Sequence, residues 1–518
     1  MINPKRQEGR VIFGATLILY LLMGLVLVFR FQLYQRDAMA RTVHALMIFF
    51  GTEPKLANIG FLWPPLPVLL QLPLVLVTPL RYRGLAGNVV TAFAGATCAA
   101  YLHGLLRRLG LRRALRYLLV GIFALNPMIF LYSANGKSEM ISVALLVMQF
   151  YYYIRWAEKD SWEHLAMMGL MGGLAFLTRY EAVFLAGVFL LFIAYQLGRR
   201  GEGLAHIWAA WLLYGILVAY AVIIWVGANW FIMGHPFYFA VGPYSTNQFA
   251  LMEMRDKPWL VAVRFDVKLA LSTACERIAR FFPAFYLTSA LVIVRVICHR
   301  NRHLLIYLLL PIIFIFNALV NYLWGFPLVY IRYYILTIPI SFILGAMFLA
   351  HIRSSVFLEL VVAVILLLSA PATALMMNEQ TSTIGEHYFI QRMLGHELPP
   401  PYPAERQMAA YIIEHISRRD ILADTAAGSD VIFFTGKPAL FVLPADSDFH
   451  RALYAPYGRV GYVLVPEAED AGRVNQIVKT YPDLQHVEDV GWARLVYRVE
   501  GWRLYRVLSN PGANGQGD

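Results

Sequence analysis

The chain has 518 residues, of which 59% are hydrophobic and only 15% are charged, and its mean hydropathy is +0.57. These values lie far outside the range of soluble proteins and indicate a polytopic membrane protein. Residues 1–377 hold 14 acidic and 31 basic residues, a net charge of +17, whereas residues 378–518 hold 18 acidic and 13 basic residues, a net charge of −5. We therefore expect a transmembrane domain over residues 1–377 and a separate soluble domain over residues 378–518. The basic residues form short clusters between apolar runs, as in cytoplasmic loops, so the charge does not indicate a nucleic-acid partner.

Apolar runs of about 16 to 25 residues predict a mainly α fold with about eleven membrane-spanning helices. Their approximate bounds are residues 11–30, 84–106, 117–135, 140–156, 163–178, 182–197, 206–230, 282–298, 304–322, 334–350 and 356–375. A further apolar run, Pro64–Leu80, contains five prolines. If it crossed the bilayer, the basic cluster Arg107–Arg116 would face outward, against the positive-inside rule. We therefore expect Pro64–Leu80 to lie in the outer interface or to be re-entrant.

This topology places the unusual residues on the outer face. The N-terminus is expected in the cytoplasm and the C-terminal domain outside it, in a multi-pass protein of the plasma (inner) membrane. The two long outer loops, residues 31–83 and 231–281, are long enough to carry amphipathic surface helices. The inner loops are short and basic, so any catalysis is expected on the outer side.

Four carboxylates stand near the outer boundary: Asp37 follows the first span, Glu53 lies in the first outer loop, and Glu139 and Glu181 open later spans. A carboxylate at the edge of a low-dielectric layer is costly, which makes each a candidate for function. Each also has an ordinary structural explanation. Asp37 suits the N-terminal end of a helix, paired with Arg36 or Arg41, and Glu139 suits the positive end of the helix that follows it.

Cations and aromatic side chains accompany these carboxylates. Lys137, Arg179 and Arg332 suit an anion, although Arg179 could equally pair with Glu139 or Glu181 and Arg332 could snorkel at the boundary. Together they predict an outward cavity for an amphiphile whose anionic head lies at the surface, such as a lipid-phosphate-linked substrate. The other candidate binding residues on this face are Lys55, Trp63, Tyr180 and His235, the last of which also suits a simple turn.

Short motifs follow one another over residues 10–375. They are Asp37 after the first span, Pro64-Pro65-Leu66, Glu139 after Pro127, Leu177-Thr178-Arg179, Gly234-His235-Pro236, and Arg332-Tyr333 with Pro339. In their order and sidedness they resemble the motifs of the GT-C membrane glycosyltransferases. The resemblance is greatest to the branch of the protein O-mannosyltransferases and the bacterial aminoarabinose transferases.

The chain departs from the family pattern at three positions. The family often has a phosphate-binding lysine before Pro-Pro, where this chain has Trp63, and Lys55 is the nearby substitute. The family's Asp-Glu pair appears as Asp37-Ala38, which argues against a true protein O-mannosyltransferase. His235 stands where the family has asparagine.

The resemblance implies a hexosyl- or pentosyltransferase that moves a sugar from a polyprenyl-phosphate donor to a hydroxyl of a glycan, lipid or protein acceptor. In an inverting displacement a carboxylate takes the acceptor proton and cations stabilise the leaving phosphate. Asp37 is the expected base, Lys137, Arg179 and Arg332 the phosphate ligands, and Glu139 a residue that orients the sugar or tunes an arginine. The sequence has no cluster of histidines and carboxylates at metal-ligand spacing, so no cofactor is required and a carboxylate-bound divalent cation is left open.

Three alternatives are weighed against this function. A polysaccharide polymerase or ligase would share the outer face but would use a lipid-pyrophosphate-linked glycan. A transporter would need polar residues along a path through the spans, where this chain has few. A non-catalytic scaffold would not explain why charged residues cluster on the outer face.

The tail alternates helical and strand patterns, which predicts a small α/β domain that binds or positions the acceptor or caps the cavity. Helices are expected at Ala404–Arg418 and Ala468–Thr480. Strands are expected at residues 421–423, 439–442, 460–465, 484–490, 493–499 and 502–507. Asp424, Asp430, Asp446 and Asp448 are interpreted as solvated loop carboxylates rather than as a second site.

The topology can be tested directly. A tag after residue 518 and a tag near Glu202 should lie on opposite sides of the membrane, because Arg107–Arg116 is inside only if Pro64–Leu80 does not cross. Single cysteines introduced at positions 82 and 110 should react with a membrane-impermeant reagent from opposite sides. Labelling of both from one side would contradict the predicted topology.

Overall fold

The computed structural model describes residues 4–82, 84–245, 258–299, 302–324, 330–352, 355–379, 384–467 and 474–508. The chain forms two compact units, each built from segments that are distant in the sequence. The first unit comprises Met1–Arg30, Asn88–Pro236 and Glu253–Leu398, and the second comprises Phe31–Gly87, Phe237–Met252 and Pro399–Asp518. Residues 31–87, which contain the first of the two loops predicted to be outside, thus belong to the same unit as the C-terminal tail.

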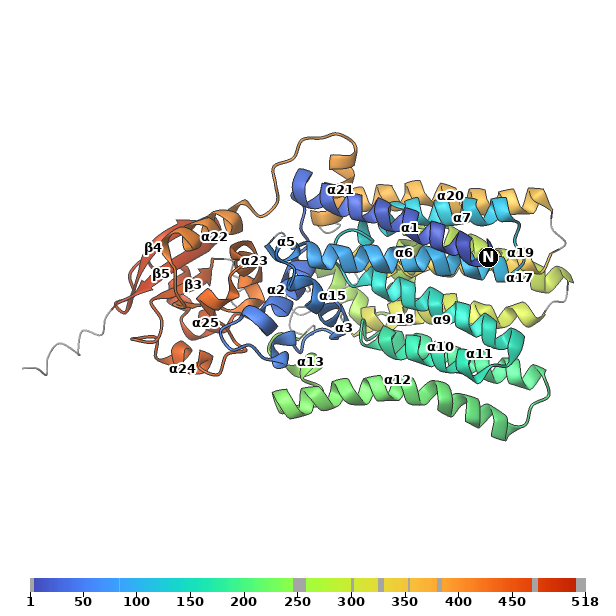
Figure 1. Ribbon diagram of the computed structural model, residues 1–518, viewed down its shortest axis with the longest axis horizontal. Coiled ribbons are helices and arrows are strands. Elements are labelled where there is room, and N and C mark those ends of the chain that lie inside the picture. The colour runs from blue at the N-terminus through green and yellow to red at the C-terminus, as the bar shows by residue number, and fades with distance from the viewer. Residues whose placement is uncertain are drawn as a thin grey trace, which may run out of the picture. The chain divides into compact units, whose positions relative to one another are not determined.

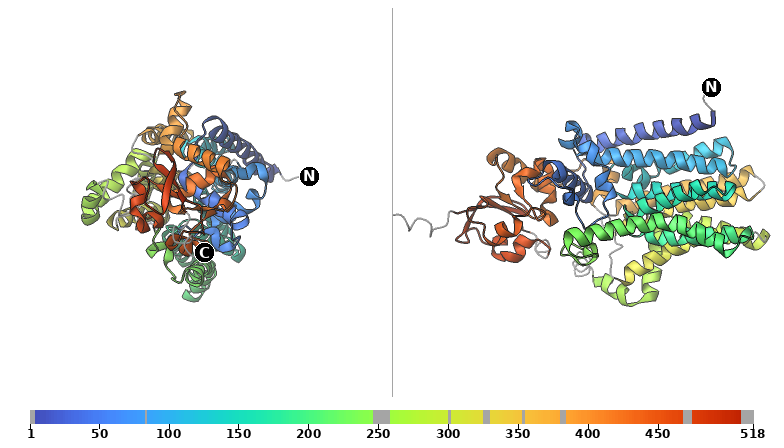
Figure 2. Two further views of the ribbon diagram at one scale, coloured as in Figure 1. Left: turned by 90° about the vertical axis from the view of Figure 1, so that its left-hand side faces the viewer. Right: turned by 60° about the horizontal axis from the view of Figure 1, so that its bottom comes forward.

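The first unit is a helical bundle whose long helices lie side by side in Figure 1 and in the right-hand view of Figure 2. They are α1 (Pro4–Leu25) with the π-helical turn η1 (Val26–Arg30), α6 (Leu85–Arg108), α7 (Arg113–Leu125), α8 (Pro127–Tyr132), α9 (Glu139–Lys159), α10 (Trp162–Phe176), α11 (Ala182–Arg199), α12 (Leu204–Met233), α15 (Pro258–Phe265), α16 (Val267–Phe281), α17 (Ala284–His299), η3 (Arg302–Leu308), α18 (Leu309–Leu323), η4 (Ile331–Tyr334), α19 (Thr337–Ala350), α20 (Val356–Asn378) and α21 (Ile384–Met393).

The prediction of a polytopic helical membrane protein is confirmed, and every predicted span coincides with helical residues. Among the described residues, eight helices are long and apolar enough to cross a bilayer, and the pair α16 and α17, bent by 100°, would make a ninth. The predicted span at 117–135 is interrupted between α7 and α8, where the side chain of Asn126 accepts the N–H of Met128 and Pro127 begins the new helix. The span predicted at 163–178 is α10, which has 15 residues.

The prolines divide the apolar run Pro64–Leu80 into three short helices in the second unit. These are α3 (Leu66–Leu69), α4 (Leu72–Val75) and α5 (Thr78–Tyr82). Each has only four or five residues, whereas a span needs about 20. The same unit holds α2 (Arg36–Phe50), η2 (Leu56–Ile59) and α13 (Tyr238–Val241) from the two outer loops.

The tail forms the expected small α/β domain. Its elements are α22 (Pro403–His415), β1 (Ile421–Leu422), α23 (Thr425–Thr435), η5 (Pro438–Leu440), β2 (Phe441–Val442), α24 (Phe449–Tyr454), β3 (Tyr462–Pro466), α25 (Gln476–Thr480), η7 (Pro482–Gln485), β4 (Ala493–Val499) and β5 (Trp502–Val507). The five-stranded sheet has the order β2-β1-β3-β5-β4. The pairs of β1 with β2 and β3 are parallel, and β5 runs antiparallel to both β3 and β4.

The structure corrects parts of the tail prediction. The strand expected at 484–490 is wrong: Pro482 starts the 3₁₀ turn η7 there, and the residues after it are not in a strand. The helix expected at Ala468–Thr480 begins only at Gln476, as α25, because the side chain of Asn475 caps it by accepting the N–H of Val478. Residues 468–473 of this prediction lie outside the described residues. Helices α23 and α24 were not predicted: α23 mixes apolar residues with glycine, serine and aspartate, and α24 has only six residues.

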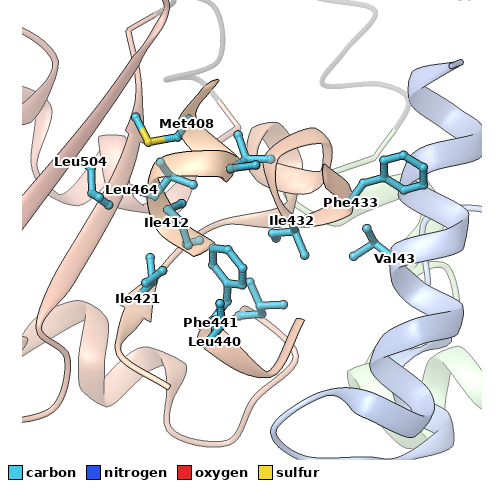
Figure 3. Packing of buried hydrophobic residues seen from close by; sticks show 14 of the residues in the cluster. Val43, Met408, Ile412, Ile421, Ile432, Phe433, Leu440, Phe441, Leu464 and Leu504 are labelled. Carbon is cyan, nitrogen blue, oxygen red and sulfur yellow. The ribbon is translucent and has the colours of Figure 1, made fainter. Parts of the chain in front are cut away.

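Helix α2, from the first outer loop, is part of the hydrophobic core of the second unit. Val43 on α2 packs with Ile432 and Phe433 of α23, and the same cluster continues to the sheet at Ile421 and Leu464 (Figure 3). All five side chains are buried. Burial of a side chain of this size stabilises by about 1.5–3 kcal/mol, so α2 is held in place by the tail.

Glycines set the distance between α10 and α12 in the first unit. A Cβ atom at Gly169 would lie 2.8 Å from the carbonyl oxygen of Tyr214, and one at Gly173 would lie 2.8 Å from that of Leu217. Both obstacles are backbone atoms of α12, which cannot rotate away. Small residues at this spacing let membrane helices approach closely.

The substitution Gly173→Leu should therefore push α10 away from α12 and lower the free energy of unfolding by about 1–3 kcal/mol. The melting temperature of the detergent-solubilised protein measures this loss. Gly187→Leu is the matched control, because a Cβ atom at Gly187 on α11 meets no atom within 4 Å. Equal melting temperatures for the two variants would show that the contact does not limit stability.

Candidate functional site

A buried carboxylate at the start of α9 holds two arginines together in the first unit. Glu139, whose side chain is 3% exposed, accepts a hydrogen bond from Arg179 Nη1 at 3.1 Å, and Arg332 Nε lies 3.6 Å from the same Oε1 atom. The Nη2 atom of Arg179 donates to Glu181 at 2.9 Å. Burying a carboxylate costs several kcal/mol unless it is paired, and the two guanidinium groups offset that cost.

The loop before α9 is fixed by contacts with α6. Gly136 has φ +78°, a conformation that residues with a side chain rarely adopt. Its N–H donates to Thr91 Oγ1 at 3.2 Å, and Asn88 Nδ2 donates to the carbonyl oxygen of Ala134 at 2.6 Å. These contacts set the point at which α9 begins and thus the position of Glu139.

Aromatic rings support both arginines. The Cζ atom of Arg179 lies 5.3 Å from the centroid of the Tyr333 ring, and that of Arg332 lies 5.5 Å from the same ring and 4.7 Å from the Tyr330 ring. At these distances the rings attract the cations. Tyr180, by contrast, accepts a hydrogen bond from Trp225 Nε1 of α12 at 3.0 Å, so its hydroxyl serves the packing of α12.

A cavity of about 30 Å³ lies beside this cluster. Ser142, Asn317 and Asn321 add polar groups to its lining, alongside Glu139, Glu181 and the two arginines. A volume of this size admits one or two water molecules. The ion pairs of Arg179 with Glu139 and Glu181, which the sequence left open, are therefore present. Within the first unit, these two carboxylates balance the charges of Arg179 and Arg332.

Lys137 lies in a second buried polar group of the first unit. Its side chain is 2% exposed, and its Nζ atom lies 5.6 Å from the centroid of the buried Tyr132 ring. The hydroxyl of Tyr132 donates to Glu386, a fully buried carboxylate on α21. Sequence reasoning missed Glu386, although its place three residues before Phe389, on the apolar face of a helix, was a usable signal.

Asp37 lies in the first turn of α2, among charges supplied by the tail. Its neighbour Arg36 pairs with Asp430 on α23 at 3.0 Å and lies 3.8 Å from Glu405 on α22. Asp37 is close enough to Asp430 for its charge to favour the protonated form of that carboxyl. The structural explanation of Asp37 from the sequence paired it with Arg36 or Arg41, whereas the ion pairs of Arg36 run to Asp430 and Glu405.

The interpretation of four tail aspartates as solvated is wrong for three of them. Asp424, Asp430 and Asp446 are buried. Asp424 caps α23 by accepting the N–H of Ala426 at 2.8 Å, and Asp446 accepts the N–H of Leu443 at 2.8 Å. Asp448 is the partly exposed member and pairs with Arg419 at 2.7 Å. The acidic composition of the tail indicated a solvated surface, and for this reason these buried contacts were not predicted.

Lys55 and Trp63 also belong to the second unit and already have partners there. The Nζ atom of Lys55 lies 2.9 Å from Glu53, and the hydrogen bond that Glu53 accepts from Ser447 lowers the pKa of its carboxyl to about 2. The guanidinium of the buried Arg41 lies over the Trp63 ring at 4.8 Å. A cation thus occupies the face of the tryptophan that replaces the lysine expected before Pro-Pro.

His235 stands at the C-terminal end of α12 in the first unit. It follows Gly234, the left-handed C-cap of α12, and its side chain is exposed. It does not line the cavity beside Glu139. Within the part of the chain that the structure describes, no three histidine, cysteine or carboxylate side chains are arranged to hold a metal ion.

Comparisons with known proteins identify the fold. A family model described as dolichyl-phosphate-mannose-protein mannosyltransferase matches residues 66–225, a stretch that includes Glu139 and Arg179. The match to the structure of ArnT from Cupriavidus metallidurans bound to undecaprenyl phosphate covers 97% of this chain and 98% of the ArnT chain, with a TM-score of 0.56 and 14% identity. A second match is to the archaeal oligosaccharyltransferase AglB from Archaeoglobus fulgidus, in complex with an inhibitory peptide and a dolichol-phosphate. It covers 97% of this chain and 74% of the AglB chain, with a TM-score of 0.49 and 12% identity. No curated protein matches the chain by sequence.

The resemblance to the GT-C membrane glycosyltransferases is thereby confirmed, and the fold is GT-C-like with a small sheet at its C-terminal end. The family match begins after Asp37 and ends before His235 and Arg332. The roles of these residues therefore rest on their own chemistry.

The pair of Arg36 and Asp430 leads to a prediction about pH. Burial raises the pKa of the Asp430 carboxyl from 3.8 to about 7, against the opposing charge of Arg36. Between these two values the folded state holds a proton that the unfolded state has lost, so the free energy of unfolding should fall as pH rises from about 4 to about 7. Asp430→Asn should remove this decline. The difference in free energy of unfolding between this variant and the unchanged protein should therefore shift in favour of the variant by on the order of 3 kcal/mol between pH 4 and pH 7.

Thermal unfolding of both proteins across this pH range measures the difference. Asp448→Asn is the control, since Asp448 is a partly exposed carboxylate on the same domain. A decline with pH that persists in Asp430→Asn would mean that another group causes it.

Proposed function

We propose that this protein transfers a sugar from a polyprenyl-phosphate donor to an acceptor hydroxyl at the outer face of the membrane, with inversion. The observation that carries the proposal is the buried cluster in which Arg179 and Arg332 share Glu139. It lies at one end of α9 in a bundle whose fold is shared with a structure that contains undecaprenyl phosphate. Such a site provides fixed cations where the head group of a membrane lipid would lie.

The leaving group of the reaction is a lipid phosphate, which needs cations more than it needs a proton. Arg179 uses two of its N–H groups for Glu139 and Glu181, whereas a guanidinium has five. The remaining donors suit phosphate oxygens in a planar, bidentate arrangement. We assign the donor phosphate to Arg179 and Arg332, with Lys137 as a supporting cation, while Glu139 orients the two guanidinium groups.

Asp37 is the proposed general base. Its carboxylate takes the proton of the acceptor hydroxyl as that oxygen forms a bond to the anomeric carbon, and the bond from this carbon to the phosphate oxygen breaks with its electron pair. The new bond forms on the face opposite the leaving phosphate, so the configuration inverts. The neighbouring Arg36 directs its ion pairs to Asp430 and Glu405.

Arg41 is a candidate for the cation that the family places before Pro-Pro. It is buried, it stands one helical turn after Asp37, and its Nη1 atom lies 3.5 Å from the carbonyl oxygen of Asp37. Its contact with Trp63 fixes the guanidinium. Lys55 is a weaker candidate, because binding phosphate would require it to leave Glu53.

A general base contributes about 100- to 10,000-fold to the rate. Asp37→Asn should therefore abolish most turnover with a polyprenyl-monophosphate sugar, while the protein still inserts, folds and binds the donor. Asp37→Glu should restore little, because one extra methylene misplaces the oxygen. Transfer rate and melting temperature are measured on the same preparation with radiolabelled donor.

Asp266→Asn is the matched control, since Asp266 is a carboxylate that caps a helix by accepting the N–H of Leu269. A residue of that kind affects stability by about 1 kcal/mol and leaves the rate nearly unchanged. Near-normal turnover by Asp37→Asn would remove Asp37 as base and move that role to Glu139. Turnover with a lipid-pyrophosphate-linked glycan in place of the monophosphate donor would favour a polymerase or ligase.

A further inference from the structure

A second cavity lies at the other end of α9, away from Glu139. It has a volume of about 390 Å³ and is lined by α1, α6 and α9. Arg155 on its wall follows Glu139 by 16 residues along the same helix, which places the two about 24 Å apart. This is most of the thickness of a bilayer core, so the second cavity opens at the opposite membrane boundary from the proposed reaction site.

The lining of this cavity is basic. Arg10, Arg107 and Arg155 come one from each of its three helices, and no acidic residue is among the lining residues. Two carboxylates stand at the same end. Glu8 pairs with Arg113 and Arg116 and lies 3.6 Å from Nε2 of His103, a lining residue, and Glu158 pairs with Arg108. The cavity therefore differs from the cluster at Glu139, where charges balance.

Tyrosines give the cavity fixed walls. The hydroxyl groups of Tyr101 and Tyr152 lie 3.0 Å apart, and the rings of Tyr101 and Tyr151 meet edge to face at 5.0 Å. The guanidinium of Arg155 lies 5.8 Å from the Tyr151 ring. Its Nε atom is buried and has no hydrogen-bond partner among the described residues. A buried donor of this kind is usually satisfied by a bound group or by water.

The cavity continues onto an apolar surface. Phe13 on α1 lines it, and the Phe13 ring meets that of Phe93 on α6 at 5.3 Å. The side chain of Phe93 is 57% exposed, on a helix that is apolar enough to span the bilayer. An ordinary boundary arginine extends into water alone, whereas here three arginines surround a cavity that leads to a lipid-facing surface.

We propose that this cavity binds the phosphate head group of an anionic membrane lipid, with an acyl chain along Phe13 and Phe93. Arginine suits the head group because its planar N–H fork pairs with phosphate oxygens. The tyrosine hydroxyls add donors, and the volume of about 390 Å³ accommodates a head group. The site lies at the end of the bundle that the sequence predicts to be cytoplasmic, and it stands independently of the proposed transferase activity.

The test uses the full-length protein in a neutral detergent, with phosphatidylglycerol or phosphatidylcholine added and retained lipid counted by native mass spectrometry. The unchanged protein should retain phosphatidylglycerol in preference to phosphatidylcholine. Arg155→Ala should weaken this binding by at least about tenfold, since it removes a charge-assisted contact. Gly9→Leu should weaken it as well without any change of charge, because Gly9 lines the cavity and a Cβ atom there meets nothing within 4 Å.

Arg199→Ala is the matched control. Arg199 is an exposed arginine in the last turn of α11 and lies outside the lining, so its loss should leave retention unchanged. Equal retention of both lipids, or an equal effect of Arg199→Ala and Arg155→Ala, would overturn the proposal in favour of diffuse attraction. Displacement of phosphatidylglycerol by millimolar inorganic phosphate would overturn the assignment to a lipid, since a lipid held also by its chain should resist it. Melting temperatures confirm that each variant is folded.

Discussion

The burial of α2 against the tail is the contact on which the candidate chemistry of the second unit depends. Val43 and its neighbours on α2 lie in one hydrophobic core with α23 and the sheet. Asp37 stands in the first turn of that helix, so its backbone position follows from side-chain packing that the tail supplies. The ion pairs of Arg36 with Asp430 and Glu405 add a polar contact at the same helix end. The small domain is therefore a structural part of the loop that bears the proposed base.

The two ends of α9 illustrate two ways of placing arginine in a membrane protein. At Glu139, carboxylates balance the guanidinium groups and the remaining space admits only a water molecule or two. The space beside Arg155 is much larger, and its lining has three arginines and no carboxylate. Because an excess of positive charge is costly away from water, the second arrangement favours an anionic occupant, whereas at Glu139 the carboxylates hold the two guanidinium groups in place.

The sequence predicted the fold well because membrane helices follow from long apolar runs and charge asymmetry. It also predicted that Glu139 and Arg179 could pair, since both stand at the same end of adjacent spans. It did not predict that Glu386 and Asp430 are buried, because each partner lies hundreds of residues away and an acidic tail normally indicates a solvated surface. The interruption of the predicted span at Asn126 and of the predicted strand near Pro482 was missed for a simpler reason. The apolar pattern continues across both sites, while the side chain of Asn126 and the ring of Pro482 favour a local turn.

The shared core also has a consequence for biosynthesis. Thr52, just after α2, hydrogen-bonds to Phe441 across 389 residues of sequence, which a ribosome adds in roughly 20–80 s at 5–20 residues per second. During that interval the apolar face of α2 has emerged but the surface that covers it has not been synthesised. The nascent chain must therefore keep this face shielded, by the bilayer interface or by a chaperone, while the intervening helices insert. Late synthesis of the tail makes completion of the Asp37 loop one of the final steps of assembly.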